Sequence, residues 1–85
     1  MDVPDGWALE EAGKALIRSF IFKDFAEAFA FLTRVAMYAE KVDHHPDFCV
    51  RWNRVDFRLT THDTGRATER DTKLAEAIGR LEGDR

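Results

Sequence analysis

The sequence predicts one α+β domain over residues 1–85, built from a four-stranded antiparallel sheet with helices packed on one face. Two observations lead to this fold class. The chain has 85 residues, of which 45% are hydrophobic, which is enough for one core but not for two domains of ordinary size. The spacing of its apolar residues changes along the chain in the order strand, strand, helix, strand, strand, helix. This order favours an antiparallel sheet that helices cover on one face.

Two strands are expected before the first helix. Residues 4–6 predict a turn before a short strand at residues 7–9, and Gly13 predicts a turn before a longer strand at residues 15–22. The apolar residues of the longer strand are Leu16, Phe20 and Phe22 on one face and Ile17 and Ile21 on the other. A strand with one solvent-facing side has apolar residues on one face only. Because this strand has them on both faces, we expect it to be a central strand or to lie at a subunit contact.

The most regular helical pattern follows Asp24. Asp24 and Glu27 form a capping pair, after which apolar residues repeat at helical spacing over about four turns. The first apolar stripe contains Phe25, Ala28, Phe29, Leu32, Ala36 and Ala39, and the second contains Phe31, Val35, Tyr38 and Val42. One stripe can cover the sheet. The second stripe is expected either to be buried in the same domain or to form a subunit interface.

Alternation between apolar and polar residues resumes after Pro46. Strands are expected around residues 50–52 and 55–61. Asn53 and Arg54 are expected to form the turn between them, because Asn tolerates the left-handed conformation of a tight hairpin.

A final helix is predicted after Gly65 interrupts the strand pattern. Thr68 and Asp71 form a second capping pair at its start, and Gly83 is placed to end it. The apolar residues of this helix are Leu74, Ala75, Ile78 and Leu81. This helix completes the expected order of elements.

The charge distribution argues against nucleic acid as a partner. The chain has 16 acidic and 13 basic residues and a net charge of -3, so no strong positive field is expected. Arg51, Arg54 and Arg58 form one local basic cluster, interleaved with aromatic residues. We interpret these arginines as the solvent-facing side of a strand and not as a phosphate-binding stripe.

The chain is expected to be a cytoplasmic protein without disulfides. Cys49 is the only cysteine, so it cannot form an internal disulfide, and we expect it to pack within a strand. No apolar stretch reaches the roughly 20 residues that span a bilayer, and the N-terminus lacks the basic start of a signal peptide, so no membrane association is expected. A domain this small has a thin stability margin, and self-association is therefore expected.

The three histidines of the chain lie close to predicted element ends. His44 and His45 leave the long helix, and His62 ends the last strand. The acidic residues in the same window are Glu40, Asp43, Asp63 and Asp71. Because several elements meet near these loops, a shared pocket is expected. Histidine populates both protonation states near neutral pH, so the cluster can divide the roles of acid and base.

Three other interpretations of the histidines stay open on the residues alone. His44 and His45 before a proline can be a polar helix end that faces the helix dipole. Three histidines with carboxylates can bind zinc or iron, although the side chains of adjacent histidines diverge, and no metal is expected. Cys49 with a histidine base can act as a nucleophile, although no activating neighbour is evident. The residues alone name no substrate.

Longer motifs resemble a known family. The segments EKVDHHPDF (residues 40–48), NRVDFRLTTHDTG (residues 53–65) and TERD (residues 68–71) closely resemble the pterin-4a-carbinolamine dehydratase family. The upstream GW pair (residues 6–7) and FIFKDFAEAFAFLTRVA (residues 20–36) resemble the same family. The resemblance covers nearly the whole chain.

The resemblance implies an enzyme, a hydro-lyase without cofactor or metal. Members remove water from a 4a-hydroxytetrahydropterin to give a quinonoid dihydropterin. This step recycles the tetrahydrobiopterin used by aromatic amino acid hydroxylases, and it implies a functional link to phenylalanine hydroxylase. Members have a four-stranded antiparallel sheet and assemble as homodimers or homotetramers, with sheets that join across subunits.

The resemblance also implies roles for individual residues. His44 and His62 would be the acid and base nearest the leaving hydroxyl, and His45 would position the ring. Glu40 and Asp71 would orient these imidazoles, although Glu40 can also be a solvated helix residue and Asp71 a helix cap. The residues expected to bind the pterin are Asp43, His44, His45, Pro46, Thr60, Thr61, His62 and Asp63.

The sequence departs from the family at two places. The helix that commonly precedes the GW pair is expected to be missing. After His62, Arg66 and Ala67 replace a glycine and a leucine, and Arg66 is expected to tune the substrate or narrow the mouth of the pocket. Two other functions stay open: a non-catalytic interaction module that binds a transcription factor, and a dehydratase for a different pterin linked to molybdenum cofactor metabolism.

Overall fold

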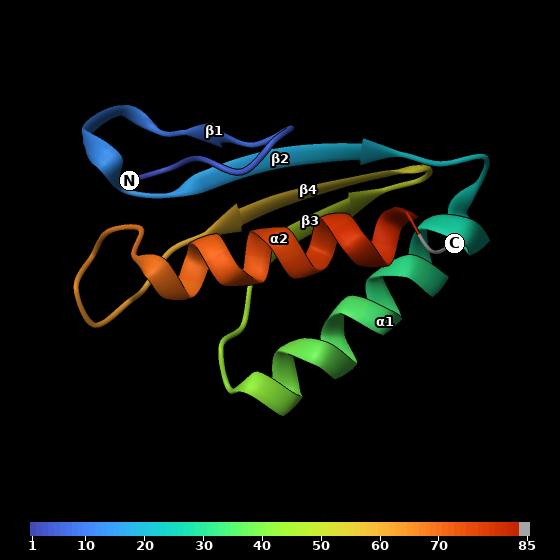
Figure 1. The fold of residues 1–85 in the computed structure, drawn as a ribbon. Helices are drawn as coiled ribbons and strands as arrows, with labels where there is room; N and C mark the ends of the chain where they lie inside the picture. The colour runs from blue at the N-terminus through green and yellow to red at the C-terminus, as the bar shows by residue number, and fades with distance from the viewer. Residues whose placement is uncertain (84–85) are drawn as a thin grey trace.

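Four antiparallel strands form the sheet, in the order β1-β2-β4-β3 (Figure 1). The structure is a computed structural model that describes residues 1–83. Its elements in chain order are β1 (Ala8–Leu9), a short 3-10 helix η1 (Glu11–Gly13), β2 (Leu16–Ile21), α1 (Phe25–Val42), β3 (Asp47–Arg51), β4 (Arg54–Leu59) and α2 (Glu69–Gly83). The predicted fold class is confirmed, and β2 is a central strand as expected, because it lies between β1 and β4.

The core lies between the sheet and the two helices, which cover the same face of the sheet (Figure 1). The largest fully buried apolar side chains are Leu16, Phe31, Val35, Val55, Leu59, Leu74 and Ile78. The ring of Phe20 lies 5.2 Å from that of Phe31 and 5.8 Å from that of Phe57, between centroids. Burying each such ring contributes roughly 2–3 kcal/mol, so this aromatic cluster joins α1 firmly to β2 and β4.

The predicted caps form at the starts of both helices. The Asp24 carboxylate accepts a hydrogen bond from the Glu27 amide at 2.9 Å, and the Glu27 carboxylate accepts one from the Lys23 amide at 3.1 Å. At α2, the Asp71 carboxylate accepts from the Thr68 amide at 2.8 Å. These bonds satisfy amide groups that have no partner within the helix. α2 continues to Gly83, the last residue that the structure describes, so the predicted end at this glycine stays a prediction.

Of the two alternatives for the second stripe of α1, the structure supports burial in the same domain for Phe31 and Val35. Phe31 and Val35 are 0% exposed, because they pack against the aromatic residues of β2 and β4 in the core of their own domain. Two members of the first stripe, Phe25 and Phe29, are 50% and 53% exposed, and their rings stack at 5.8 Å. The buried side of α1 therefore takes residues from both stripes, namely Ala28, Leu32 and Ala39 from the first and Phe31 and Val35 from the second.

The turn between β3 and β4 lies one residue earlier than predicted. Arg51 pairs with Arg54, so the turn residues are Trp52 and Asn53, and Trp52 has the positive φ of 49°. The reason is that Asn53 is tied to the end of β2. Its side-chain amide donates to the Phe22 carbonyl at 2.9 Å, and its own carbonyl accepts from the Phe22 amide at 2.8 Å.

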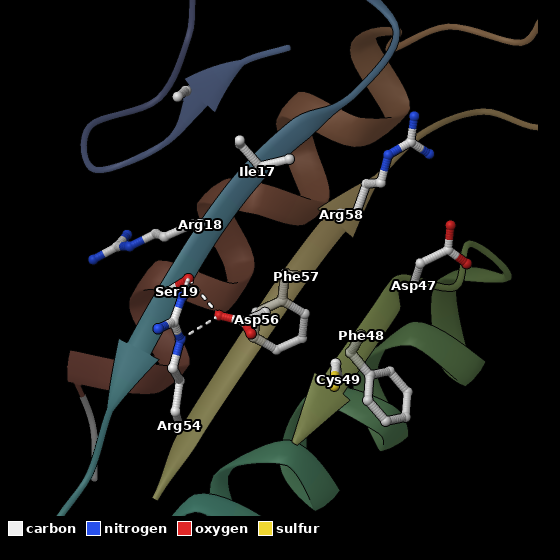
Figure 2. Close-up of a pocket in the computed structure, with 11 residues that line it drawn as sticks. Ile17, Arg18, Ser19, Asp47, Phe48, Cys49, Arg54, Asp56, Phe57 and Arg58 are labelled. Carbon is white, nitrogen blue, oxygen red and sulfur yellow. Dashed lines mark hydrogen bonds and ion pairs between the residues drawn. The ribbon is translucent and has the colours of Figure 1, made fainter. Parts of the chain in front are cut away.

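The face of the sheet opposite the helices is open and carries a network of charged side chains (Figure 2). Asp56 on β4 accepts from Arg54 at 2.7 Å, from Arg51 at 2.9 Å and from the Ser19 hydroxyl. The predicted solvent-facing arginines are therefore confirmed. Cys49 lies exposed on this face (Figure 2), so the expectation that it packs inside a strand is wrong. Cys49 pairs with Asp56 and therefore faces outward, whereas the pairs on either side of it place Val55 and Phe57 of β4 on the buried face.

Asp56 gives this face a pH-dependent contribution to stability. The hydrogen bond from Ser19, followed by those from Arg54 and Arg51, lowers the pKa of Asp56 from 3.8 to about 2. Because the folded pKa is lowered, the stabilisation is present above pH 4 and is lost as the pH falls toward 2. The shift corresponds to roughly 2 kcal/mol, which solvent screening reduces to about 1 kcal/mol at this exposed network.

We therefore predict that Asp56→Asn lowers the free energy of unfolding by about 1 kcal/mol at pH 7 and by much less at pH 2.5. Urea unfolding of both proteins at the two pH values measures this difference. Asp2→Asn, which removes an exposed carboxylate outside the network, serves as the matched control. An equal loss at both pH values would contradict the assignment of this stabilisation to the ionised carboxylate.

Candidate active site

The three histidines meet at one end of the sheet, where α1 ends and the chain leaves β4 for α2. They line a pocket of about 260 Å³. Its lining residues are Asp43, His44, His45, Pro46, Asp47, His62, Asp63 and Arg70. All except Asp47 and Arg70 are pterin-binding residues predicted from the sequence. The sequence analysis missed Asp47, which follows Pro46, and Arg70, which precedes Asp71. Their closeness to the motifs is the only sequence signal that could have identified them as pocket residues.

The C-terminal turn of α1 separates the two adjacent histidines. Asp43 ends the helix in the left-handed conformation, with φ 54° and ψ 42°. The His44 amide then donates back to the Ala39 carbonyl at 3.2 Å. This turn satisfies carbonyl groups at the helix end and reverses the chain direction. As a result His44 is 9% exposed, whereas His45 is on the surface.

His44 is held by a buried carboxylate. Its Nε2 lies 2.6 Å from Oδ1 of Asp71, which is 0% exposed. An ionised carboxylate only accepts hydrogen bonds, so the proton of the neutral imidazole lies on Nε2. The other ring nitrogen, Nδ1, then carries a free electron pair. His44 is thus oriented as a proton acceptor in the manner of a histidine whose tautomer an aspartate fixes.

Asp71 has hydrogen-bond partners on both oxygens. Oδ2 accepts from the Thr61 hydroxyl at 2.8 Å and from the Thr68 amide at 2.8 Å. The hydroxyls of Thr61 and Thr68 lie 2.6 Å from each other. A buried carboxylate needs this number of donors, and its position in the first turn of α2 also favours negative charge. Asp71 thus caps α2 and is also a hydrogen-bond partner of His44.

The other two histidines are exposed and lie beside carboxylates. Nε2 of His45 lies 2.8 Å from Oε1 of Glu40, as predicted for an orienting acid. Nε2 of His62 lies 3.8 Å from Oδ1 of Asp47, which is an ion-pair distance but not a hydrogen bond. The side chains of His45 and His62 are 55% and 71% exposed. The site therefore combines one fixed, buried imidazole with two imidazoles that are accessible from solvent.

Three predicted residues have side chains outside the lining of the pocket. Thr61 lies behind it and binds Asp71. The Thr60 hydroxyl donates to the Lys14 carbonyl at 2.7 Å, so the geometry does not support a side-chain contact between Thr60 and substrate. Arg66 lies beside Gly13 and does not line the pocket, so the expectation that its side chain narrows the mouth is wrong.

A larger hollow of about 570 Å³ lies on the open face of the sheet (Figure 2), and no histidine lines it. Its walls include Ile17, Cys49 and the Asp56 network. Over residues 1–83, no group of three His, Cys, Asp or Glu side chains is arranged to hold a metal ion. No helix in the same range is both long and apolar enough to cross a membrane.

Known proteins match this chain over nearly its whole length. The family model described as pterin 4 alpha carbinolamine dehydratase matches residues 1–81. A protein of Rhizorhabdus wittichii named "Putative pterin-4-alpha-carbinolamine dehydratase" is 53% identical over 81 residues, which are 95% of this chain and 84% of that protein. A protein of the same name from Rhodospirillum rubrum is 52% identical over 82 residues, 96% of this chain and 84% of that protein.

Solved structures give the same result. The crystal structure of a transcriptional coactivator/pterin dehydratase from Brucella melitensis matches with a TM-score of 0.85 and 45% identity, over 91% of this chain and 82% of that one. A pterin dehydratase-like protein described as a RuBisCO assembly factor in the alpha-carboxysome shares the fold, with a TM-score of 0.79 and 23% identity over 92% of this chain and 90% of that one. From its sequence relatives and its fold, the chain belongs to the pterin 4 alpha carbinolamine dehydratase family.

Proposed function

We propose that this protein removes water from a 4a-hydroxytetrahydropterin to give a quinonoid dihydropterin, by general acid and base catalysis without a metal. The observation that carries the proposal is the buried pair of His44 and Asp71 in a pocket that two further histidines line. Family membership supports the pterin as the substrate class.

The reaction needs one proton donor and one proton acceptor. Hydroxide is a poor leaving group, so an acid protonates the C4a oxygen as the C4a–O bond breaks and water leaves. A base removes the proton from N5, and the electron pair of the N5–H bond forms the new C4a–N5 double bond. We assign the base to Nδ1 of His44, because Asp71 holds the proton of the neutral ring on Nε2. We assign the acid to protonated His62, which lies beside Asp47.

The remaining pocket residues bind and orient the ring. A tetrahydropterin presents an amino group and several N–H groups along its edge, and these require acceptors. Asp43 and Asp63 line the pocket and supply carboxylate oxygens. His45, which is paired with Glu40, positions the ring. In the cell the reaction would recycle the cofactor of cytoplasmic aromatic amino acid hydroxylases such as phenylalanine hydroxylase.

We also propose that the protein is a homo-oligomer and that the exposed residues of α1 contribute to the contact. Phe25 and Phe29 stack on each other and leave about half of their surface in water, next to the exposed Ala36. Burial of such aromatic surface contributes about 25 cal/mol per Å², which favours association with a second copy. This surface replaces the one predicted from Phe31 and Val35.

The acid and base assignments predict large losses of activity. His44→Ala and His62→Ala should each lower kcat about 100-fold or more, since general acid or base catalysis contributes roughly 10²–10⁴-fold. Absorbance in the ultraviolet follows the dehydration, after correction for the spontaneous rate and with chelator present. Cys49→Ala, which changes an exposed residue on the open face, should retain full activity. If both histidine variants kept wild-type rates, the mechanism would be wrong.

The tautomer argument predicts a separate effect of Asp71→Asn. The amide can donate to Nε2 of His44, which moves the ring proton to Nδ1 and removes the base. We expect kcat to fall about 10- to 100-fold, with a change in the nitrogen NMR shifts of His44 that reports the tautomer. Glu76→Gln on the exposed side of α2 is the control. Lost activity with an unchanged His44 spectrum would show that Asp71 acts only through stability.

The oligomer proposal predicts that Phe29→Lys shifts the protein toward the monomer. The charge on the substituted side chain would have to be buried in the contact, which is unfavourable. Sedimentation measures the assembly, and Ala30→Lys, at an exposed position on another side of the same helix, is a control for added charge. A wild-type protein that is monomeric at high concentration would contradict the proposal.

A further inference from the structure

A second hollow adjoins the histidine pocket. It has a volume of about 160 Å³, and it shares His44 and Arg70 with the histidine pocket. Its other walls come from both helices, with Tyr38 and Val42 on α1 and Lys73 and Leu74 on α2. The two hollows therefore meet at the imidazole that we assign as the base.

The two hollows differ in charge. Asp43, Asp47 and Asp63 line the histidine pocket. No acidic residue lines the second hollow within the described chain, and its charged side chains are Arg70 and Lys73. The histidine pocket thus offers carboxylate acceptors, whereas the second hollow offers the donor groups of Arg70 and Lys73 and apolar surface. A ligand that fills both hollows needs a donor-rich ring and an acceptor-rich substituent.

The cations of the second hollow are not neutralised by strong ion pairs. Arg70 donates to the Asp43 carbonyl at 3.2 Å, and no carboxylate lies within ion-pair distance of its guanidinium in residues 1–83. Lys73 has an ion pair with Glu69 at 3.3 Å, but both side chains are more than 70% exposed, and such pairs are weak. Arg70 also lies in the first turn of α2, where the helix dipole adds to the positive potential.

The chemistry of the proposed reaction directs a substituent toward this hollow. The reacting bond joins C4a to N5, and C6 is bonded to N5. The first atom of a substituent on C6 is therefore two bonds away from N5, the atom that gives its proton to His44. Because His44 and Arg70 line both hollows, a substituent that leaves the ring beside His44 can extend into the second hollow.

We propose that the second hollow binds the C6 substituent of the pterin and favours a short apolar stem with an anionic end over the uncharged side chain of tetrahydrobiopterin. Tyr38, Val42 and Leu74 contact the stem, and Arg70 and Lys73 bind the anion. This inference rests on the proposed function, because it takes the position of the ring from the dehydration mechanism.

Binding of stable, oxidised pterins tests the inference without catalysis. The probes are 6-hydroxymethylpterin and its phosphate ester, which differ only in the anionic group. We expect wild-type protein to bind the phosphate ester about tenfold more tightly, measured by titration calorimetry, since a charge-assisted hydrogen bond contributes about this factor. Arg70→Gln and Lys73→Gln should each reduce the ratio of the two dissociation constants several-fold.

Arg80→Gln on the same helix is the matched control and should leave the ratio unchanged, because Arg80 lines neither hollow. Circular dichroism checks that each variant is folded. Equal affinity of wild-type protein for the two probes, or a preference that survives both substitutions, would overturn the inference. The dehydration assay tests the proposed function separately. A folded protein that prefers the phosphate ester but does not dehydrate either 4a-hydroxy form would contradict the proposed function and support the subsite.

Discussion

The buried carboxylate of Asp71 is the group on which the fold and the site both depend. It caps α2 through the Thr68 amide, fixes the loop after β4 through Thr61, and holds His44 at the end of α1. A buried carboxylate is stable only when its oxygens have partners, so these three segments must meet for the domain to close. The same contacts determine which nitrogen of His44 carries the proton of the neutral ring. Folding and the orientation of the proposed catalytic base therefore depend on the same hydrogen bonds of Asp71.

The sequence predicts the elements of this fold well because their ends are marked by local interactions. The pairs Asp24 with Glu27 and Thr68 with Asp71 form their hydrogen bonds within one helical turn, so spacing alone identifies them. The buried side of α1 could not be predicted in this way. Both apolar stripes have helical spacing, and the buried side takes residues from each, because Phe31 contacts strands that are distant in the sequence.

The candidate site shows the same division between local and distant information. The motifs identify the histidines, but they do not indicate that His44 is buried and that His45 is exposed. That difference comes from the left-handed turn at Asp43, which sends adjacent side chains in different directions. The motifs also do not show that the Thr61 hydroxyl donates to Asp71 behind the pocket. Asp47 and Arg70 have no signal of their own beyond their closeness to the motifs, and only the folded chain brings them to the pocket.

In the proposed mechanism the pterin binds against His44, acidic residues surround its ring, and the open face of the sheet takes no part in the reaction. A crystal structure of the protein with a stable 7,8-dihydropterin tests this claim most directly. We predict that the N5–C4a edge of the ring lies about 3 Å from Nδ1 of His44, in the pocket that His45 and His62 line. A dihydropterin bound instead in the hollow on the open face, with His44 free of ligand, would contradict the account.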